Sequence, residues 1–200
     1  MNNDDVPELQ SLWDEAKGHI DQGNDDKAIE IYKYILIRYA GNAIVVEYAN
    51  AYLGDVFLKM RHLDRAEKHL KRAIDLAPSN AHYYYLLGFV YSLKEQWRKA
   101  PGAFQKAIAL DPHNGEYERG LGWARFNGGN RTEGIAHLYR ALELSPSNQH
   151  VMTDLAAAML ILGNTDKARE YGEKALRLDP SYVLARDLLK TIDQIEGKRT

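Results

Sequence analysis

The sequence predicts an all-α protein in which helix-turn-helix units repeat along the chain as a solenoid. Four of its six prolines stand 34 residues apart, at Pro78, Pro112, Pro146 and Pro180. Similar segments surround them: AIDLAPSN, AIALDPHN, ALELSPSN and ALRLDPSY. A period of about 20 to 50 residues is typical of solenoids, in which each unit buries its apolar face against its neighbours. A protein of this kind acts by presenting a surface.

The composition shows no linker and excludes several classes of function. Hydrophobic residues make up 45% of the 200 residues, the net charge is −2, and cysteine is absent. Without cysteine there is no disulfide, no thiolate metal site and no cysteine nucleophile. A near-neutral charge without a basic face argues against a nucleic-acid partner.

The chain also lacks the patterns that predict membrane insertion or secretion. No apolar run approaches the roughly 18 residues of a membrane-spanning helix. The first residues, MNNDDVPELQ, are polar and acidic, unlike a signal peptide. We therefore expect a soluble protein in the cytoplasm.

Alignment on the prolines gives four repeats, 47–80, 81–114, 115–148 and 149–182. One slot holds leucine in every repeat and is followed by a small residue: Leu53-Gly54, Leu87-Gly88, Leu121-Gly122 and Leu155-Ala156. A second small slot holds Ala66, Ala100, Gly134 and Ala168. Small residues at two fixed positions predict that the two helices of a repeat pack closely there, where a larger side chain would overpack the contact.

The turns inside the repeats are predicted as well. Gly23-Asn24, Gly129-Asn130 and Gly163-Asn164 place a glycine where one helix ends and an asparagine where the next begins. Glycine accepts the left-handed conformation past a helix end, and asparagine caps free N–H groups at a helix start.

The repeats are flanked by atypical segments. A degenerate first repeat is predicted over 9–42, and four additional residues, 43–46, extend the next helix backwards from an Asn42 cap. After the last repeat, apolar residues at helical spacing predict a capping helix over 183–196, because a terminal repeat needs its apolar face covered. We expect a single solenoid over 7–197, preceded by a disordered tail over 1–6.

Pro101-Gly102 conflicts with its place inside a predicted helix, because both residues are poor helix formers. Proline is harmless only in the first turn of a helix. Either this helix begins late, near Ala100, or it is kinked.

This pattern resembles the tetratricopeptide repeat, whose signature places aromatics, Leu-Gly, Ala, Phe and Pro at fixed offsets. Repeat 81–114 matches it with Tyr84, Leu87, Gly88, Tyr91, Ala100, Phe104, Ala107 and Pro112. The resemblance implies a right-handed α-solenoid of five tetratricopeptide-type repeats plus the capping helix. It also implies a concave groove, lined by the first helix of each repeat, in which a partner lies.

Catalysis is not predicted. The seven histidines are scattered, and His62 and His69 lie about 10 Å apart by helix rise, too far to share a metal. No nucleophile–base arrangement and no phosphate-binding loop is present. We expect no enzymatic activity, no cofactor and no metal.

The geometry of the family predicts which side chains face the groove. The predicted peptide-binding residues are Trp13, Lys17, Tyr48, Tyr52, Asp55, His82, Tyr85, Phe89, Arg119, Trp123, Phe126 and His150. Seven of them are large aromatics, which bury much area at little entropic cost. Each of these aromatics either faces the groove or packs between adjacent repeats. Arg119 pairs either with an acidic residue of a ligand or with Glu116 on its own helix.

Two functions remain in competition. The leading hypothesis is a non-enzymatic adaptor that holds a peptide or helical segment of a partner protein in the aromatic groove. The alternative is a self-assembling, homo-oligomeric scaffold whose groove holds a terminal segment of a neighbouring copy, because the helix over 183–196 is amphipathic enough to serve as a ligand. The lysines and asparagines with which chaperone-binding family members hold a carboxylate are absent here, apart from Lys17.

Overall fold

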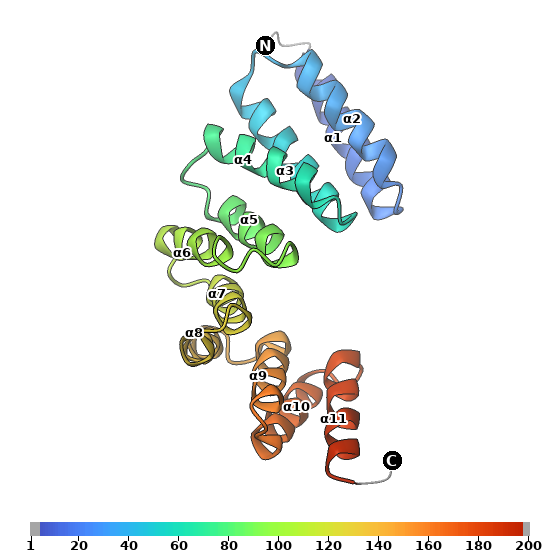
Figure 1. The fold of residues 1–200 in the computed structure, drawn as a ribbon. Coiled ribbons are helices and arrows are strands. Elements are labelled where there is room, and N and C mark those ends of the chain that lie inside the picture. The colour runs from blue at the N-terminus through green and yellow to red at the C-terminus, as the bar shows by residue number, and fades with distance from the viewer. Residues whose placement is uncertain (1–4, 198–200) are drawn as a thin grey trace. The chain divides into compact units, whose positions relative to one another are not determined.

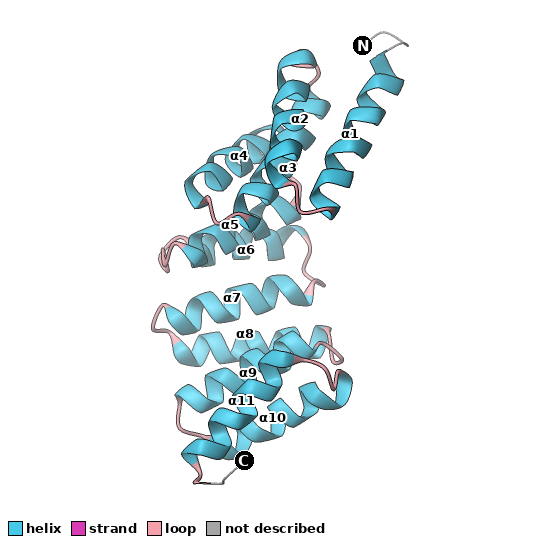
Figure 2. Cartoon of the chain, turned by 90° about the vertical axis from the view of Figure 1, so that its right-hand side faces the viewer, coloured by secondary structure: helices cyan, strands magenta, loops and turns pink. Residues whose placement is uncertain are grey.

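The computed structural model describes residues 5–197 and confirms the all-α prediction (Figure 1). Within this range there are eleven α-helices and no strand (Figure 2). The helices are α1 (Asp5–Asp21), α2 (Asp25–Arg38), α3 (Ala43–Lys59), α4 (Leu63–Leu76), α5 (Ala81–Leu93), α6 (Ala100–Leu110), α7 (Gly115–Asn127), α8 (Arg131–Leu144), α9 (Gln149–Ile161), α10 (Thr165–Leu178) and α11 (Val183–Ile195).

The chain divides into two compact units, an N-terminal unit (Met1–Gln96) and a C-terminal unit (Trp97–Thr200). Within each unit, a helix packs mainly on the helices next to it in the chain. For example, α4 packs on α3 and α5, and α8 packs on α7 and α9. The first helices α5, α7 and α9 begin 34 residues apart, where the predicted repeats begin. The extent of the solenoid and its repeat boundaries stay predictions.

Helix α3 is one turn longer than its counterparts, as the inserted residues predict. It has 17 residues, whereas α5, α7 and α9 each have 13. The additional turn begins directly after Asn42, whose side-chain Oδ1 accepts hydrogen bonds from the backbone N–H groups of Ile44 and Val45. The predicted Asn42 cap is therefore confirmed, and it fixes where the helix starts.

The two small slots bring the backbones of paired helices into contact. A Cβ atom on Gly134 of α8 would lie 2.6 Å from the backbone N of Phe126 and 2.7 Å from the backbone O of Gly122, both on α7. In the N-terminal unit, a Cβ on Gly54 would lie 2.7 Å from Cγ of Leu70. The predicted close packing is confirmed at these positions, because neither glycine leaves room for a larger side chain.

The inter-helix turns require a left-handed residue. The predicted glycines adopt it, with φ of +76° at Gly23, +96° at Gly129 and +78° at Gly163. In the two remaining repeats, Arg61 and Glu95 take the same conformation, with φ of 61° and 55°. Left-handed backbone costs a residue with a Cβ about 1–2 kcal/mol, so the turn geometry is kept even where the sequence opposes it.

The asparagines after these glycines cap less uniformly than predicted. Oδ1 of Asn164 accepts a hydrogen bond from the backbone N–H of Lys167. The side chains of Asn24 and Asn130 make no cap hydrogen bond, although both residues stand at the N-cap position. The structure therefore corrects the predicted side-chain cap at these two turns, where the backbone geometry alone sets the helix start.

Helix α6 begins late, which resolves the conflict at Pro101. It starts at Ala100 and has 11 residues, against 14 in α4, α8 and α10. Pro101 thus lies in the first turn, where its missing N–H costs no helical hydrogen bond. The late start, rather than a kink, is the alternative that the structure supports.

The two ends of the chain differ in part from their predictions. Helix α1 starts at Asp5, so Val6 is helical and the tail predicted over 1–6 is too long; residues 1–4 lie outside the described range. Helix α11 ends at Ile195 and packs on α9 and α10. It buries Ala185 and Ile192, whereas Leu184 and Ile195 are about 60% exposed. Helix α11 therefore covers the last repeat with only a narrow strip of buried apolar residues and leaves other apolar residues exposed.

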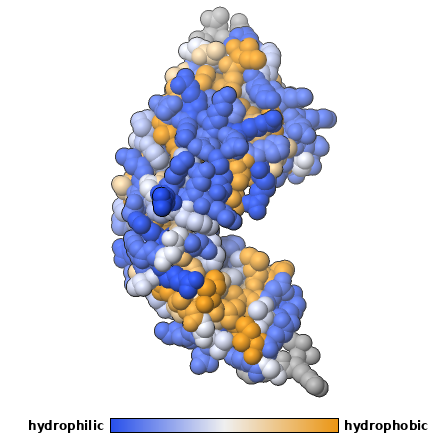
Figure 3. Space-filling model, viewed as in Figure 1, coloured by the Kyte–Doolittle hydropathy of each residue, from blue (hydrophilic) through white to orange (hydrophobic). Residues whose placement is uncertain are grey.

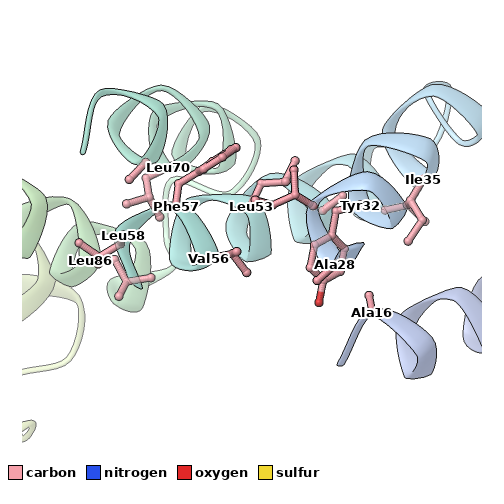
Figure 4. Packing of buried hydrophobic residues seen from close by; sticks show 14 of the residues in the cluster. Ala16, Ala28, Tyr32, Ile35, Leu53, Val56, Phe57, Leu58, Leu70 and Leu86 are labelled. Carbon is pink, nitrogen blue, oxygen red and sulfur yellow. The ribbon is translucent and has the colours of Figure 1, made fainter. Parts of the chain in front are cut away.

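The core of the N-terminal unit passes from helix to helix, with buried side chains that include Ala16, Tyr32, Leu53, Leu70 and Leu86 (Figure 4). At its surface, Glu67 of α4 ties α4 to α5. Its carboxylate accepts hydrogen bonds from Lys71 Nζ at 2.7 Å and from Lys94 Nζ, at the end of α5, at 2.6 Å. Desolvation favours the neutral acid, but these two lysines outweigh it and lower the pKa of Glu67 to about 2.

Replacing Gly134 by alanine should destabilise the protein, although alanine favours helix by about 1 kcal/mol over glycine. The new methyl group meets backbone atoms of α7 that cannot move aside, so we expect a loss of about 1–3 kcal/mol. Gly102→Ala is the matched control, because a Cβ at Gly102 meets nothing within 4 Å. Urea denaturation followed by circular dichroism measures both variants. A Gly134→Ala protein as stable as the control would contradict the close contact.

Glu67 should make stability depend on pH in acid. Because its folded pKa lies below the unfolded value of 4.5, its contribution is present above pH 4.5 and is lost as the pH falls towards 2. We expect Glu67→Gln to lower the free energy of unfolding at pH 7 by about 1–3 kcal/mol and to flatten this part of the pH profile. Urea titrations between pH 2 and 7 measure both effects, and parallel profiles for the two proteins would refute the assignment.

Candidate functional site

A pocket of about 490 Å³ opens between α1 and α3 of the N-terminal unit. Its aromatic walls are Trp13 of α1, Tyr32 of α2 and Tyr48 and Tyr52 of α3. The remaining lining residues are Gln10, Asp14, Lys17, Ile20, Asp21 and Asp55. Helical spacing produces this arrangement, because Trp13 and Lys17, like Tyr48, Tyr52 and Asp55, recur three or four residues apart on one helix face.

A second pocket of about 290 Å³ adjoins the first and is shared between α3 and α5. Tyr48, Tyr52 and Asp55 line both pockets, and His82, Tyr83 and Leu86 close the second one from α5. We call the two pockets together the N-terminal groove. It brings together six of the twelve predicted site residues: Trp13, Lys17, Tyr48, Tyr52, Asp55 and His82.

The aromatic rings of the groove contact one another in a fixed cluster. The ring centroids of Tyr32 and Tyr52 are 5.3 Å apart, and the rings are stacked at an interplanar angle of 10°. Trp13 lies 5.4 Å from each of them, tilted by 45°. Tyr48 and Tyr52 nevertheless remain 49% and 46% exposed. Tyr52 therefore contacts two other rings and still leaves about half of its surface open.

Tyr32 is a groove residue that the sequence prediction missed, because it lies on a second helix. It is buried, and desolvation, followed by the charges of Tyr52 and Asp55, raises the pKa of its phenol to about 12. Tyr32 occupies the slot that holds Leu70, Phe104 and Leu138 in later repeats. A hydroxyl at an otherwise apolar slot is the signal that could have revealed it.

The groove carries more negative than positive charge. Asp14, Asp21 and Asp55 line the first pocket together with one lysine, Lys17. Lys59, at the end of α3, is engaged elsewhere by an ion pair of 2.8 Å with Asp25. Desolvation raises the pKa of the Asp55 carboxyl above its usual value, although His82 and Lys59 act to lower it.

Three predicted residues form a stripe along α5. The rings of His82 and Tyr85 are 5.9 Å apart, and those of Tyr85 and Phe89 are 6.2 Å apart. Phe89 is 38% exposed, whereas Tyr85 is half-buried against the core. Of these three residues only His82 lines the second pocket, and Tyr85 and Phe89 lie further along α5, outside it.

The remaining predicted residues lie in the C-terminal unit, where Arg119 of α7 is held by two carboxylates. Its guanidinium bonds to Glu116 Oε2 at 2.8 Å, which confirms the pairing within the helix, and Nη1 bonds to Asp154 Oδ2 of α9 at 2.8 Å. Desolvation opposes the charge, but Asp154 and Glu116 raise the pKa of Arg119. The guanidinium is thus committed to two neighbouring residues, and the Asp154 contact went unpredicted.

Phe126 does not face an open groove, which corrects its prediction. It is 3% exposed and lies in a core cluster with Leu138, Val151 and Leu155. Trp123 is half-buried and stacks on Phe126 with ring centroids 6.0 Å apart. Of the two alternatives for these aromatics, packing between helices applies to Phe126.

His150 is exposed at the start of α9 and contacts Tyr182, the N-cap residue of α11. Its Nδ1 lies 2.7 Å from the Tyr182 hydroxyl, and the two rings meet edge to face at 5.2 Å. His150 therefore ties the last repeat to the capping helix.

Among residues 5–197, no group of three or more His, Asp or Glu side chains is placed to hold a metal ion. In the same range, none of the helices is both long enough and apolar enough to cross a membrane.

Comparison with known proteins bears on the fold as a whole. The family model described as the tetratricopeptide repeat matches residues 46–185, which leaves the predicted first repeat outside the match. Similar crystal structures include MamA, at 24% identity over 82% of this chain and 94% of that chain with a TM-score of 0.68, and YrrB, at 22% identity over 88% of both chains with a TM-score of 0.65. PilW has 18% identity over 99% of this chain and 88% of that chain, with a TM-score of 0.83. At these identities the similarity shows the fold. A search of curated proteins found no match.

Removing the Arg119 guanidinium should leave two partly buried carboxylates without their cation. The side chains of Arg119 and Asp154 are 21% and 22% exposed, so we expect Arg119→Gln to cost about 1–3 kcal/mol of stability. Arg140→Gln is the control, since Arg140 forms an exposed pair with Glu143 that is worth no more than about 0.5 kcal/mol. Urea denaturation of both variants measures the difference. Equal stability of the two variants would show that the Arg119 contacts contribute nothing.

Proposed function

Because the chain belongs to the tetratricopeptide repeat family, we propose that it is a non-enzymatic adaptor. In this proposal the N-terminal groove holds a peptide or a helical segment of a partner protein. The observation that carries the proposal is the pair of adjoining pockets walled by Trp13, Tyr48 and Tyr52. Trp13 and Tyr52 are positioned by contact with each other, and Tyr48 and Tyr52 are about half exposed.

The energetics of aromatic side chains support this use of the groove. Leaving Tyr48 and Tyr52 about half exposed forgoes the stability that burying them would give. A ligand that covers these rings gains that free energy, and the entropic cost is small because a tyrosine side chain has few rotatable bonds. Tryptophan and tyrosine are also enriched among the residues that dominate binding energy.

A structural neighbour supports the same class of function. YrrB, which shares the fold, is described as having an unusual peptide-binding site. A peptide ligand is likewise what we propose for this chain. For the C-terminal unit by itself, Trp123 and His150 stay proposed contact residues, whereas the guanidinium of Arg119 is already paired with Glu116 and Asp154.

A second candidate function is self-assembly, and the exposed apolar edge of α11 favours it. Val183, Leu184 and Ile195 are each more than half exposed, and hydrophobic residues gather on the surface of the C-terminal unit in the lower part of Figure 3. In this alternative, α11 of one copy would lie in the groove of another copy.

Tyr52→Ala should abolish capture of the partner, because it removes one of the two rings shared by both pockets and the one that contacts Trp13 and Tyr32. We expect a loss of about 2 kcal/mol or more in binding free energy, which corresponds to roughly 30-fold weaker binding. Tyr34→Ala is the matched control, since Tyr34 is also 46% exposed and lines neither pocket. The measurement is affinity capture from cell lysate by wild type and both variants, with mass spectrometry of the retained proteins.

The pattern of retention decides between the candidates. A protein captured by wild type and Tyr34→Ala, but lost with Tyr52→Ala, would support the adaptor. Capture of further copies of the chain alone would favour self-assembly. Identical capture by all three proteins would contradict a function of the groove.

A further inference from the structure

The chemistry of the first pocket points to one kind of ligand group. We propose that it receives a basic side chain, arginine or lysine, of the partner segment, enclosed by the rings of Trp13 and Tyr52 and by the pocket's carboxylates. This inference rests on the proposed adaptor function and states which residue of the partner the groove recognises.

The aromatic wall suits a cation. Trp13, Tyr32 and Tyr52 lie within 5.4 Å of one another by ring centroid and line the same pocket. A cation over the face of an aromatic ring is attracted by the negative charge of that face, and indole is the strongest such ring. The pocket volume of about 490 Å³ leaves room for a guanidinium or an ammonium group with its aliphatic stem.

The charges of the pocket favour a cation independently of its rings. Three carboxylates, on Asp14, Asp21 and Asp55, line the pocket against the single ammonium of Lys17. Asp14 accepts one hydrogen bond, from Gln10 Nε2 at 3.0 Å. Over residues 5–197, the side chains of Asp21 and Asp55 have no hydrogen bond or ion pair within the chain. These carboxylates are thus free to bind a positively charged ligand.

Other ligand groups fit the pocket less well. An acidic side chain would be repelled by the three carboxylates. A purely apolar side chain would displace water from Asp55 without replacing its hydrogen bonds, and burying a charge unpaired is costly. Desolvation raises the pKa of Asp55, and the attraction of His82 and Lys59 offsets it only in part. A basic side chain of the ligand would bring a cation into direct contact with this carboxylate.

The second pocket suits a different side chain. It is lined from α5 by Tyr83 and Leu86, both buried, and by His82, and it shares Asp55 as its one carboxylate. An apolar side chain would contact Leu86 there. The expected recognition element is therefore a basic residue close in sequence to an apolar residue.

Selection from a phage-displayed library of random dodecapeptides tests this inference. The full-length chain is immobilised, and Tyr52→Ala is used in parallel to identify peptides that bind elsewhere. We expect the peptides specific to wild type to share one arginine or lysine near an apolar residue. Their binding should weaken as the salt concentration is raised.

A synthetic copy of the best peptide then isolates the charge. Replacing its arginine by citrulline removes the charge and keeps the shape, and we expect about tenfold weaker binding or more by fluorescence polarisation. Asp55→Asn should weaken binding of the arginine peptide. It should also reduce the difference in affinity between the arginine and the citrulline peptide. Asp75→Asn is the matched control, because Asp75 is an exposed aspartate of α4 in the same unit that lines neither pocket.

The outcomes separate the inference from the function on which it rests. Peptides that need Tyr52 but share no basic residue, or that bind equally well with citrulline, would overturn the inference and leave the adaptor in place. Failure to select any peptide that depends on Tyr52 would overturn both. A peptide of residues 183–200, which contains Lys198 and Arg199, is assayed alongside; if it binds as tightly as the selected peptides, the occupant is a second copy and not another protein.

Discussion

The fold depends on how closely the two helices of a repeat approach each other. In the C-terminal unit, Gly122 and Gly134 leave no room for a Cβ atom between α7 and α8. In the N-terminal unit, Leu70 of α4 fills the space above Gly54 of α3. The backbone contact between α7 and α8 fixes the relative placement of these two helices more narrowly than long side chains would, because nothing flexible lies between Gly122 and Gly134.

The groove is a consequence of this tight pairing. Leu53 and Gly54 turn towards α4, so the residues on either side of them along α3, Tyr52 and Asp55, are left facing away from the pair. The large aromatic rings of the groove therefore lie on a helix whose opposite face is packed against α4. This packing holds the helix, and with it the backbone that carries the rings, in place. Gly54, which packs against α4, is thus followed directly by the pocket residue Asp55 and lies two residues after Tyr52.

The sequence predicted those features that depend on backbone chemistry. The Asn42 cap and the left-handed glycines follow from what one residue type allows, and the longer α3 follows from the four inserted residues. At Pro101 the sequence left two alternatives, a late start or a kink, and the structure decided for the late start. Arg61 and Glu95 escaped prediction because neither residue type favours the left-handed conformation. They take it in turns closed by backbone hydrogen bonds from His62 to Phe57 and from Gln96 to Tyr91. Helix ends marked by a characteristic residue could thus be predicted from the sequence. The turns at Arg61 and Glu95, which lack glycine, were seen only in the structure.

Contacts between repeats were harder to predict than the repeats themselves. Phe126 was assigned to the groove by its offset, but the rotation of α7 buries it against α8 and α9. Arg119 and Asp154 are 35 residues apart, and their contact depends on how one repeat is placed on the next. A periodic pattern states which residues are equivalent, and it does not state the angle between successive repeats.

The helix that carries Trp13 is held less firmly than the rest of the groove. Helix α1 packs on α2, and it reaches α3 through the ring contact between Trp13 and Tyr52. An end helix with one packed neighbour opens at a lower free energy than an internal helix, and its amide protons exchange sooner with solvent. Occupation of the first pocket and folding of the terminal helix are therefore linked equilibria, so a ligand bound there slows amide exchange in α1 most of all.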